Sequence, residues 1–251
     1  MHDPAVIPLE GVPSAVRAAF TTRVGGVSGG TCASRNLGIA SGDDPDAVRA
    51  NREGLASGCG FDAARAVTLA QVHGADVIEV GPAGGAGRFT GSLAGIDEAD
   101  GCVTSAPGVA LLAQGADCVP VLLWNDEGTR VAAVHAGWRG LVAGVLGHAV
   151  AAMGEGRICA AIGPCIGPCC YPVDHALRAT MAQRFGDDVV VGDAVDLRRA
   201  ARRALGAGGA VNADIADVQG CTSCDHERFF SYRRDGAGTG RQAGVIWLVD
   251  A

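Results

Sequence analysis

Six short apolar runs in the middle of the chain limit the fold more than any other feature. Each run is only three to six residues long, and glycine-containing turns lie between several of them. Runs of this length are too short for an ordinary helix and are typical of β-strands. They predict a sheet at the centre of the fold. The runs cover residues 67–69, 77–80, 102–104, 109–113, 119–124 and 131–134.

Helices and further strands are predicted around this central region. Asp44 is a capping residue and Pro45 suits a first helical turn, so a helix is expected from there to Gly58 or Gly60. Because strands and helices do not alternate strictly, the chain is predicted to be one α/β (α+β) domain over residues 1–251, with a mixed sheet and flanking helices. The other expected helices cover residues 140–153, 174–185 and 196–205, and the other strands 16–20, 158–162 and 245–249.

The charge balance excludes several classes of partner and enzyme. The 251 residues carry a formal net charge of −7, and all 20 basic residues are arginine. A chain without a basic excess does not suit phosphate backbones or anionic lipids, so neither nucleic acid nor membrane is expected as a partner. The lack of lysine excludes Schiff-base, P-loop and kinase mechanisms that need one. Phosphate would have to be held by arginine or by backbone N–H groups.

The sequence also predicts a cytoplasmic protein. The N-terminal region has no apolar stretch of signal-peptide length, and the longest apolar runs are too short to cross a bilayer. The ten cysteines are about 4% of the chain, below the content of a disulfide scaffold. They are therefore expected to be core residues or metal ligands.

A C-x2-C pair near the C-terminus, Cys221 and Cys224, lies close to His226 and resembles half of a structural zinc site. The sequence shows no second half, so buried or turn cysteines are the preferred interpretation. Three other cysteines lie among glycine and proline residues and are likewise interpreted as turn residues, namely Cys165, Cys169 and Cys170.

Three residues that can bind a metal, His73, Cys118 and His135, stand next to the ends of predicted strands. Two histidines and one cysteine form a three-ligand set for zinc, which leaves the fourth position to water or substrate. Gly74 and Gly137 leave room for the imidazole rings. However, separations of 45 and 17 residues match no local metal motif. A single histidine in an apolar run is more often a hydrogen-bonded core residue, so both interpretations stay open on the residues alone.

Eight strings, distributed over nearly the whole chain, resemble the bacterial YfiH and YlmD family. This family is also called the laccase-domain or polyphenol oxidase family, and it is described as purine nucleoside phosphorylase. The chain departs from it at Pro172, where the family commonly has glutamate, so no acid is available at this position. The strings are FTTRVGGVS at 20–28, NLG at 36–38, GDD at 42–44, QVHG at 71–74, ADCVP at 116–120, HAGWRG at 135–140, IGP at 162–164 and FFSYRR at 229–234.

The resemblance implies a mixed α/β sandwich similar to the YfiH-like cysteine hydrolase fold, with one zinc ion bound by His73, Cys118 and His135. It implies phosphorolysis of adenosine, inosine, guanosine and methylthioadenosine, and deamination of adenosine. Purine nucleosides and phosphate would be the partners. Cys118, His135 and Asp117 would serve catalysis, Asp117 as a proton carrier or an orienting residue, unless it is a plain strand-end acid. Phosphorolysis needs an anion site, which Arg23, Arg139 or the helix beginning near Trp138 could supply, and Asn36 and Gln71 are further candidates for substrate or phosphate contacts.

Two other enzyme classes fit part of the pattern. A multicopper polyphenol oxidase would bind four coppers largely through histidine, and the chain has only six histidines. A single copper on the two histidines and one cysteine lacks an obvious axial methionine. A metal-free hydrolase would use Cys118 as nucleophile and His135 as its base. His73 separates these classes, because a Cys–His dyad does not require it and a three-ligand metal site does.

Overall fold

The strands form two packed sheets and a small separate ribbon. A computed structural model describes residues 6–91, 97–210 and 214–249 of the chain. It contains a six-stranded mixed sheet, a four-stranded antiparallel sheet and a two-stranded antiparallel ribbon. The expected sheet at the centre of the fold is therefore confirmed.

The six-stranded sheet has the order β11-β8-β6-β7-β4-β3. Its four middle strands pair antiparallel, while β11 and β3 join the two edges in parallel. The bounds are β3 Val77–Glu79, β4 Gly101–Thr104, β6 Val119–Asn125, β7 Val131–Ala136, β8 Ile158–Ile162 and β11 Ile215–Asp217.

The four-stranded sheet has the order β1-β2-β12-β5 and brings together both ends of the described chain and its middle. The separate ribbon pairs β9 with β10. The bounds are β1 Val6–Pro8, β2 Val16–Thr21, β5 Leu111–Gly115, β12 Gln242–Leu248, β9 Val190–Val191 and β10 Ala194–Val195.

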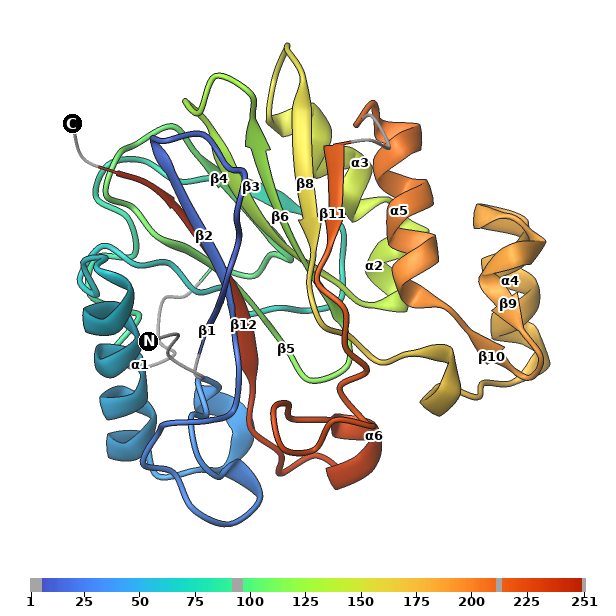
Figure 1. The fold of residues 1–251 in the computed structure, drawn as a ribbon, viewed down its shortest axis with the longest axis horizontal. Coiled ribbons are helices and arrows are strands. Elements are labelled where there is room, and N and C mark those ends of the chain that lie inside the picture. Colours follow the sequence, from blue (N-terminus) through green and yellow to red (C-terminus); the bar gives the residue numbers. More distant parts are fainter. Residues whose placement is uncertain (1–5, 92–96, 211–213, 250–251) are drawn as a thin grey trace.

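Helices cover the outer faces of both sheets (Figure 1). No helix within the described ranges is long and apolar enough to cross a membrane. The α-helices are α1 Pro45–Cys59, α2 Trp138–Ala143, α3 Val145–Ala152, α4 His175–Phe185, α5 Leu197–Gly208 and α6 Tyr232–Asp235, and the short 3-10 helices are η1 Gly30–Cys32, η2 Ile39–Ser41, η3 Pro168–Cys170 and η4 Asp187–Val189.

The core has three layers, which makes the molecule an α/β/β/α sandwich. One apolar cluster lies between the six-stranded sheet and helices α2 to α5. A second lies between the two sheets, and a third lies between the four-stranded sheet and α1. Strand β6 contributes to two of these layers, because Val121 and Leu123 face the helices while Leu122 and Trp124 face the other sheet. A strand buried on both faces reads as a continuous apolar run, as predicted for 119–124.

Several sequence-based boundaries require correction. The expected strand at 67–69 is only an isolated bridge from Val67 to Leu111, because a single residue pairs with β5. The run 109–113 forms its strand two residues later, as β5. The expected last strand at 245–249 is the end of the longer strand β12.

The single helix expected over 140–153 is also wrong, since Gly144 divides it into α2 and α3. Gly144 has φ 96°, a left-handed conformation that ends one helix and begins the next. The apolar spacing continues across the break, because Leu141, Val145 and Leu146 all pack against the same face of the six-stranded sheet. Periodicity therefore cannot reveal the interruption.

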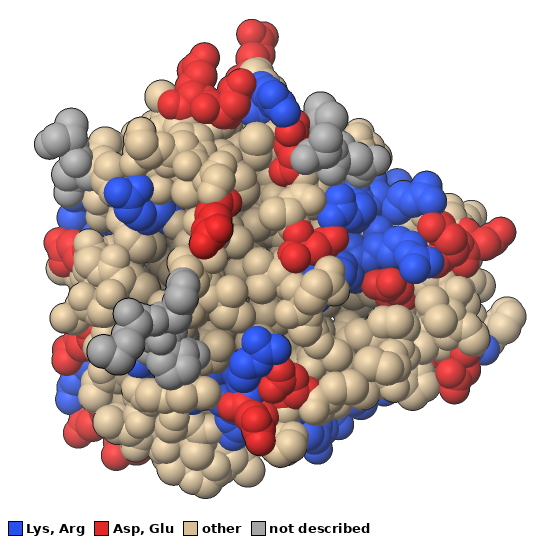
Figure 2. Space-filling model, in the orientation of Figure 1, with Lys and Arg blue, Asp and Glu red and all other residues tan. Residues whose placement is uncertain are grey.

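Helix α5 carries an arginine-rich outer face whose charge is largely balanced by nearby acids. Arg203 pairs with Asp188 at 2.9 Å, and Arg202 pairs with Asp217. Figure 2 shows a group of blue basic side chains with red acidic side chains next to it on the right of the molecule, where α5 lies in Figure 1. The strongest basic cluster in this view therefore has acidic groups directly beside it.

A pair of glycine substitutions tests the role of Gly144. Gly144→Ala is expected to lower the free energy of unfolding by about 1–2 kcal/mol, because an L-residue resists the left-handed conformation. Gly147→Ala, inside α3, is expected to raise it by about 0.5–1 kcal/mol through helix propensity. A Cβ at either position meets no atom within 4 Å, so the two changes differ only in backbone conformation. Chemical denaturation of both variants measures this, and equal effects would contradict the account.

Candidate metal centre

Strand register brings the three predicted donors to one end of the six-stranded sheet. Strand β6 pairs with β7 so that Val119 lies opposite Ala136, which places Cys118 beside Gly137. His135 is the fifth residue of β7. His73 comes from the loop that precedes β3 and has φ 61°. The donor atoms of His73, Cys118 and His135 all lie within 4.8 Å of one another.

Gly137 gives these side chains the space they occupy. A Cβ at this position would lie 2.9 Å from Cδ2 of His73 and 3.0 Å from Sγ of Cys118. The two imidazole rings meet nearly at right angles, with their centroids 4.9 Å apart. A side chain at position 137 would therefore force the donors apart.

A buried acid that the sequence did not reveal, Asp100, orients two of the donors. Its Oδ1 lies 2.8 Å from Nδ1 of His135 and accepts the backbone N–H of His73 at 2.9 Å. Its Oδ2 accepts the N–H groups of Gly74 at 2.6 Å and Val72 at 3.2 Å. With Nδ1 engaged by a carboxylate, Nε2 of His135 is the nitrogen left for a metal, as in carboxylate–histidine–zinc arrangements.

The electrostatics of the site favour an ionised thiol. Burial alone would raise the pKa of Cys118, but the charge of His135 and hydrogen bonds from His135 and His73 outweigh burial and lower it. Burial alone would lower the pKa of His135, but the Cys118 thiolate and Asp100 outweigh burial and raise it. The thiolate is the form that binds a metal or acts as a nucleophile.

Asp117 is tied to the protein on both of its carboxylate oxygens. Oδ1 accepts the Thr222 hydroxyl at 2.6 Å, and Oδ2 accepts the backbone N–H of Arg233 at 2.7 Å. Its carbonyl accepts the N–H of Ile166 at 2.9 Å, and its φ is 101°. These bonds favour the orienting role over the proton carrier, because they fix the backbone from which Cys118 projects.

The two predicted arginines occupy different surroundings. Arg139 is exposed at the start of α2, with its guanidinium 4.5 Å from the ring centroid of Trp138. The guanidinium of Arg23 donates to the carbonyls of Ala33 at 2.7 Å and His226 at 3.1 Å. Arg139 is therefore available to a ligand, whereas Arg23 first of all holds two loops together.

The two predicted amides serve the protein framework. Asn36 is fully buried, and its Oδ1 accepts the N–H groups of Gly38 and Arg241 at 2.8 Å. Gln71 exchanges two hydrogen bonds of 2.8 Å with the backbone of Gln114 on β5. Both amides shape the segments around the centre, and a direct contact of either to substrate stays a prediction.

Three residues near Cys118 were not identified as site residues from the sequence. Arg241 is close enough for its charge to interact with Cys118 and Asp117, and burial lowers its pKa. Burial raises the pKa of Tyr171, and the nearby charge of Cys118 raises it as well. The Arg233 guanidinium lies 4.9 Å from the ring centroid of Tyr171. Arg233 belongs to the string at 229–234, so only that resemblance could have indicated it.

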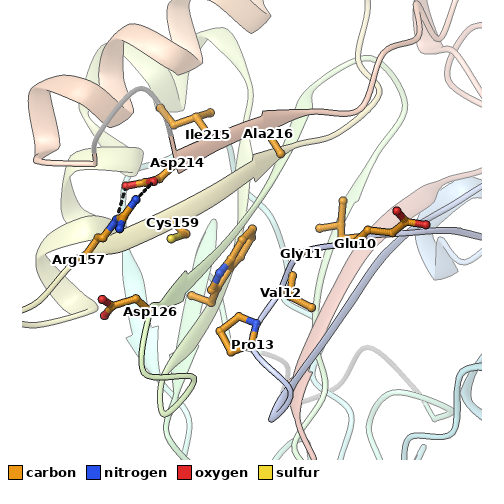
Figure 3. A pocket seen from close by; sticks show the side chains of 12 residues that line it. Glu10, Gly11, Val12, Pro13, Asp126, Arg157, Cys159, Asp214, Ile215 and Ala216 are labelled. Atoms are coloured by element: carbon orange, nitrogen blue, oxygen red, sulfur yellow. Dashed lines mark hydrogen bonds and ion pairs between the residues drawn. The ribbon is translucent and has the colours of Figure 1, made fainter.

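A surface pocket of about 530 Å³ lies elsewhere, between the segment 9–13 and strands β6, β8 and β11. Figure 3 shows the ion pair of Arg157 with Asp214 at its rim. Its lining includes Trp124 and Cys159, and it contains none of the three donor residues. The pocket therefore lies apart from the three candidate metal ligands.

Comparison with known proteins agrees with the fold and the strings. Residues 17–249 match the family model described as multi-copper polyphenol oxidoreductase laccase. The purine nucleoside phosphorylase YfiH of Escherichia coli is 38% identical over 97% of this chain and 98% of its own length. The purine nucleoside phosphorylase ORF3 of Streptomyces griseus is 42% identical over 92% of this chain and 93% of its own length.

Solved structures give the same result. The crystal structure of YlmD from Geobacillus stearothermophilus matches with a TM-score of 0.85 and 35% identity, over 94% of this chain and 93% of that one. The crystal structure of YfiH from Bacillus licheniformis matches with a TM-score of 0.91 and 30% identity, over 98% and 97%. Since similarity in sequence and structure extends over almost the whole chain, this protein belongs to the YfiH and YlmD family of laccase-domain proteins.

Proposed function

We propose that this protein is a zinc-dependent purine nucleoside phosphorylase that also deaminates adenosine. The observation that carries the proposal is the convergence of His73, Cys118 and His135, oriented by Asp100, in a chain similar over its whole length to purine nucleoside phosphorylases. The donor set fits zinc, because imidazole nitrogen and thiolate sulfur are both usual zinc ligands and three protein ligands leave the fourth position open. Zinc would supply Lewis acidity at the exposed edge of the site.

The residues around the triad suit a purine nucleoside. Two of the exposed large hydrophobic residues, Val72 and Tyr232, are chain neighbours of His73 and Arg233. Exposed apolar and aromatic surface beside polar groups is typical of a binding site for a flat heteroaromatic ring. The nucleoside would place its base against one of these two exposed side chains and its ribose toward the triad.

Arginines would hold the phosphate. In phosphorolysis an oxygen of phosphate bonds to C1′ of the ribose, the glycosidic C–N bond breaks, and the base leaves with its electron pair and takes a proton. The chain has no lysine, so arginine must balance the charge of the anion. Arg139 is the exposed candidate, two residues after Gly137, while Arg241 interacts electrostatically with Cys118 and Arg233 lies against Tyr171.

The direct test is to incubate the purified protein with adenosine or inosine, with and without phosphate. Free base and ribose-1-phosphate are expected only when phosphate is present. Inosine formed from adenosine without phosphate would report deamination. Inactivity toward every purine nucleoside, together with hydrolysis of thioesters or amides, would favour the alternative in which Cys118 and His135 form a metal-free hydrolase.

The copper alternative has a weaker structural basis. Among the described residues, the triad is the only candidate metal group that contains histidine, and it contains two. Four coppers bound largely through histidine would need many more. Metal analysis after purification separates zinc from a single copper at the triad.

Replacing a donor tests the metal role. His73→Ala is expected to lower the zinc content by one ion per chain and to reduce phosphorolysis roughly 100-fold or more, since even indirect ligand support is worth 10–100-fold. His175→Ala, an exposed histidine at the start of α4, is the matched control and should change neither value. Full phosphorolysis by a His73→Ala protein that has lost this zinc would show that the chemistry does not use the triad.

Asp100→Asn tests the orienting acid. An amide nitrogen cannot accept a hydrogen bond, so this variant must lose at least one of the bonds from His135 or the 72–74 backbone. Zinc affinity at the triad is expected to fall about 10–100-fold. Competition with a chromogenic chelator measures the affinity. An unchanged affinity in a folded variant would contradict the role assigned to Asp100.

Arg139→Ala tests the phosphate site. The KM for phosphate is expected to rise about 10-fold or more, because a charge-assisted hydrogen bond contributes about 1.5–3 kcal/mol. The KM for inosine should change much less, because the nucleoside is neutral. Arg49→Ala, an exposed arginine of α1, is the control. Equal effects of Arg139→Ala on both substrates would assign this arginine to general site structure.

A further inference from the structure

Four cysteines outside the triad come together at a second place. Cys169 and Cys170 lie in η3, and Cys221 and Cys224 lie in the loop between β11 and α6. Their sulfur atoms all lie within 4.8 Å of one another. The C-x2-C pair, which looked like half of a zinc site in the sequence, therefore has its second half about 50 residues earlier. These cysteines lie in a 3-10 helix and at a turn, as expected, but the convergence of their four sulfur atoms was not predicted.

The spacing of the sulfur atoms suits one ion and selects no single disulfide. The Cys224 sulfur is 3.5 Å from that of Cys169 and 3.3 Å from that of Cys170. Four thiolates at ~2.3 Å from a tetrahedral zinc stand roughly 3.8 Å apart. A disulfide would need one pair at about 2.05 Å, and here one sulfur has two almost equivalent neighbours.

The surrounding backbone is arranged for thiolates. The N–H of Gly167 donates to the Cys221 sulfur at 3.2 Å. The N–H groups of Ser223 and Cys224 are directed at the same sulfur. A sulfur that receives several N–H groups is stabilised as an anion, and such outer bonds are typical of the ligands in metal sites.

Positive side chains also lie close to the loop that carries the pair. Nη1 of Arg234 donates to the carbonyls of Thr222 at 2.9 Å and Ser223 at 3.1 Å. Nη2 of Arg198 donates to the carbonyl of Gly220 at 3.2 Å. Four thiolates and one divalent cation carry two net negative charges. These guanidinium groups offset part of that charge, since Arg234 also pairs with Asp235 at 2.6 Å and Arg198 with Asp217 at 3.6 Å.

The cluster is connected directly to the backbone of the triad. Thr222, between the paired cysteines, donates its N–H to the carbonyl of Cys165 at 3.1 Å and its hydroxyl to Asp117 at 2.6 Å. Asp117 in turn precedes the donor Cys118. The segment that follows β8 and the loop that precedes α6 thus meet at the cluster and around Asp117.

We propose that Cys169, Cys170, Cys221 and Cys224 bind a structural zinc ion, which fastens these two segments together and so keeps Asp117 and Cys118 in place. The site is closed, because four protein sulfurs fill the tetrahedral positions and leave none for substrate. It is a separate inference from the proposed function, since it requires neither a nucleoside nor the triad.

The test is metal analysis of the full-length protein purified without added chelator. Two zinc ions per chain are expected. Cys224→Ser should retain only the zinc ion at the triad, and Cys118→Ser should retain only the zinc ion at the four cysteines. Cys159→Ser replaces a half-buried cysteine of β8 that belongs to neither group, and it should retain both. One zinc ion in the native protein that disappears entirely with Cys118→Ser would overturn the proposal.

X-ray absorption at the zinc edge identifies the ligands without a substitution at any of the four clustered cysteines. In Cys118→Ser protein the remaining zinc should have four sulfurs at about 2.3 Å. If variants at the four cysteines fail to fold, the zinc-edge spectrum of the native protein still tests the proposal. With four sulfur ligands at one zinc ion and one at the other, the native protein should show an average of about 2.5 sulfur ligands per zinc. A protein with zinc at the triad alone should show one. Iron at these sulfurs, or a disulfide among the four cysteines in unreduced peptide maps, would overturn the proposal.

A failure here is distinguishable from a failure of the proposed function. Loss of the four-cysteine zinc should lower the thermal midpoint of Cys224→Ser relative to Cys159→Ser, whether or not the protein acts on nucleosides. An inactive protein with two zinc ions would retain this inference and refute the phosphorylase. An active protein with one zinc ion, at the triad, would support the phosphorylase and refute this inference.

Discussion

The candidate metal centre depends on the hydrogen bonds of one buried carboxylate, that of Asp100. It receives four hydrogen bonds, one from the ring of His135 and three from the backbone of residues 72–74. A buried carboxylate without such partners would be expensive, and with them it becomes a rigid acceptor. The one group therefore fixes the orientation of a strand histidine and the path of the loop that carries the other histidine.

The sheet places this acid where it is needed. In the register of β4 against β7, Gly101 lies opposite Val134, so Asp100 and His135 come next in the two antiparallel strands. The register of β6 against β7 brings Cys118 beside Gly137 in the same way. A shift of one residue in either pairing would turn these side chains to the other face. The apolar residues buried on both faces of these strands hold the register, so packing far from the centre fixes its geometry.

The sequence predicts the elements that local patterns determine. Strands buried on both faces, such as β6 and β8, read as continuous apolar runs and were located within about two residues. Asp100 could not be identified, because Asp97 and Glu98 stand beside it and only the register distinguishes it. The break at Gly144 was missed because the apolar period runs through it. The triad itself became specific only through the resemblance to a family, since its spacing matches no local motif.

Under the two proposals, the triad would carry the reaction and the four-cysteine cluster would stabilise the structure around it. The triad has three donors and an exposed histidine, an arrangement that leaves one position of a tetrahedral ion to a ligand. The four-cysteine cluster offers a complete set and no open position. Thr222 and Asp117 lie between them, linked by a hydrogen bond of 2.6 Å. Because Asp117 has φ 101°, an unfavourable conformation for a residue with a side chain, it needs support from outside its own strand. The loop that carries Cys221 and Cys224 provides that support through Thr222, so the proposed zinc ion at the four cysteines would stabilise the strained backbone beside Cys118.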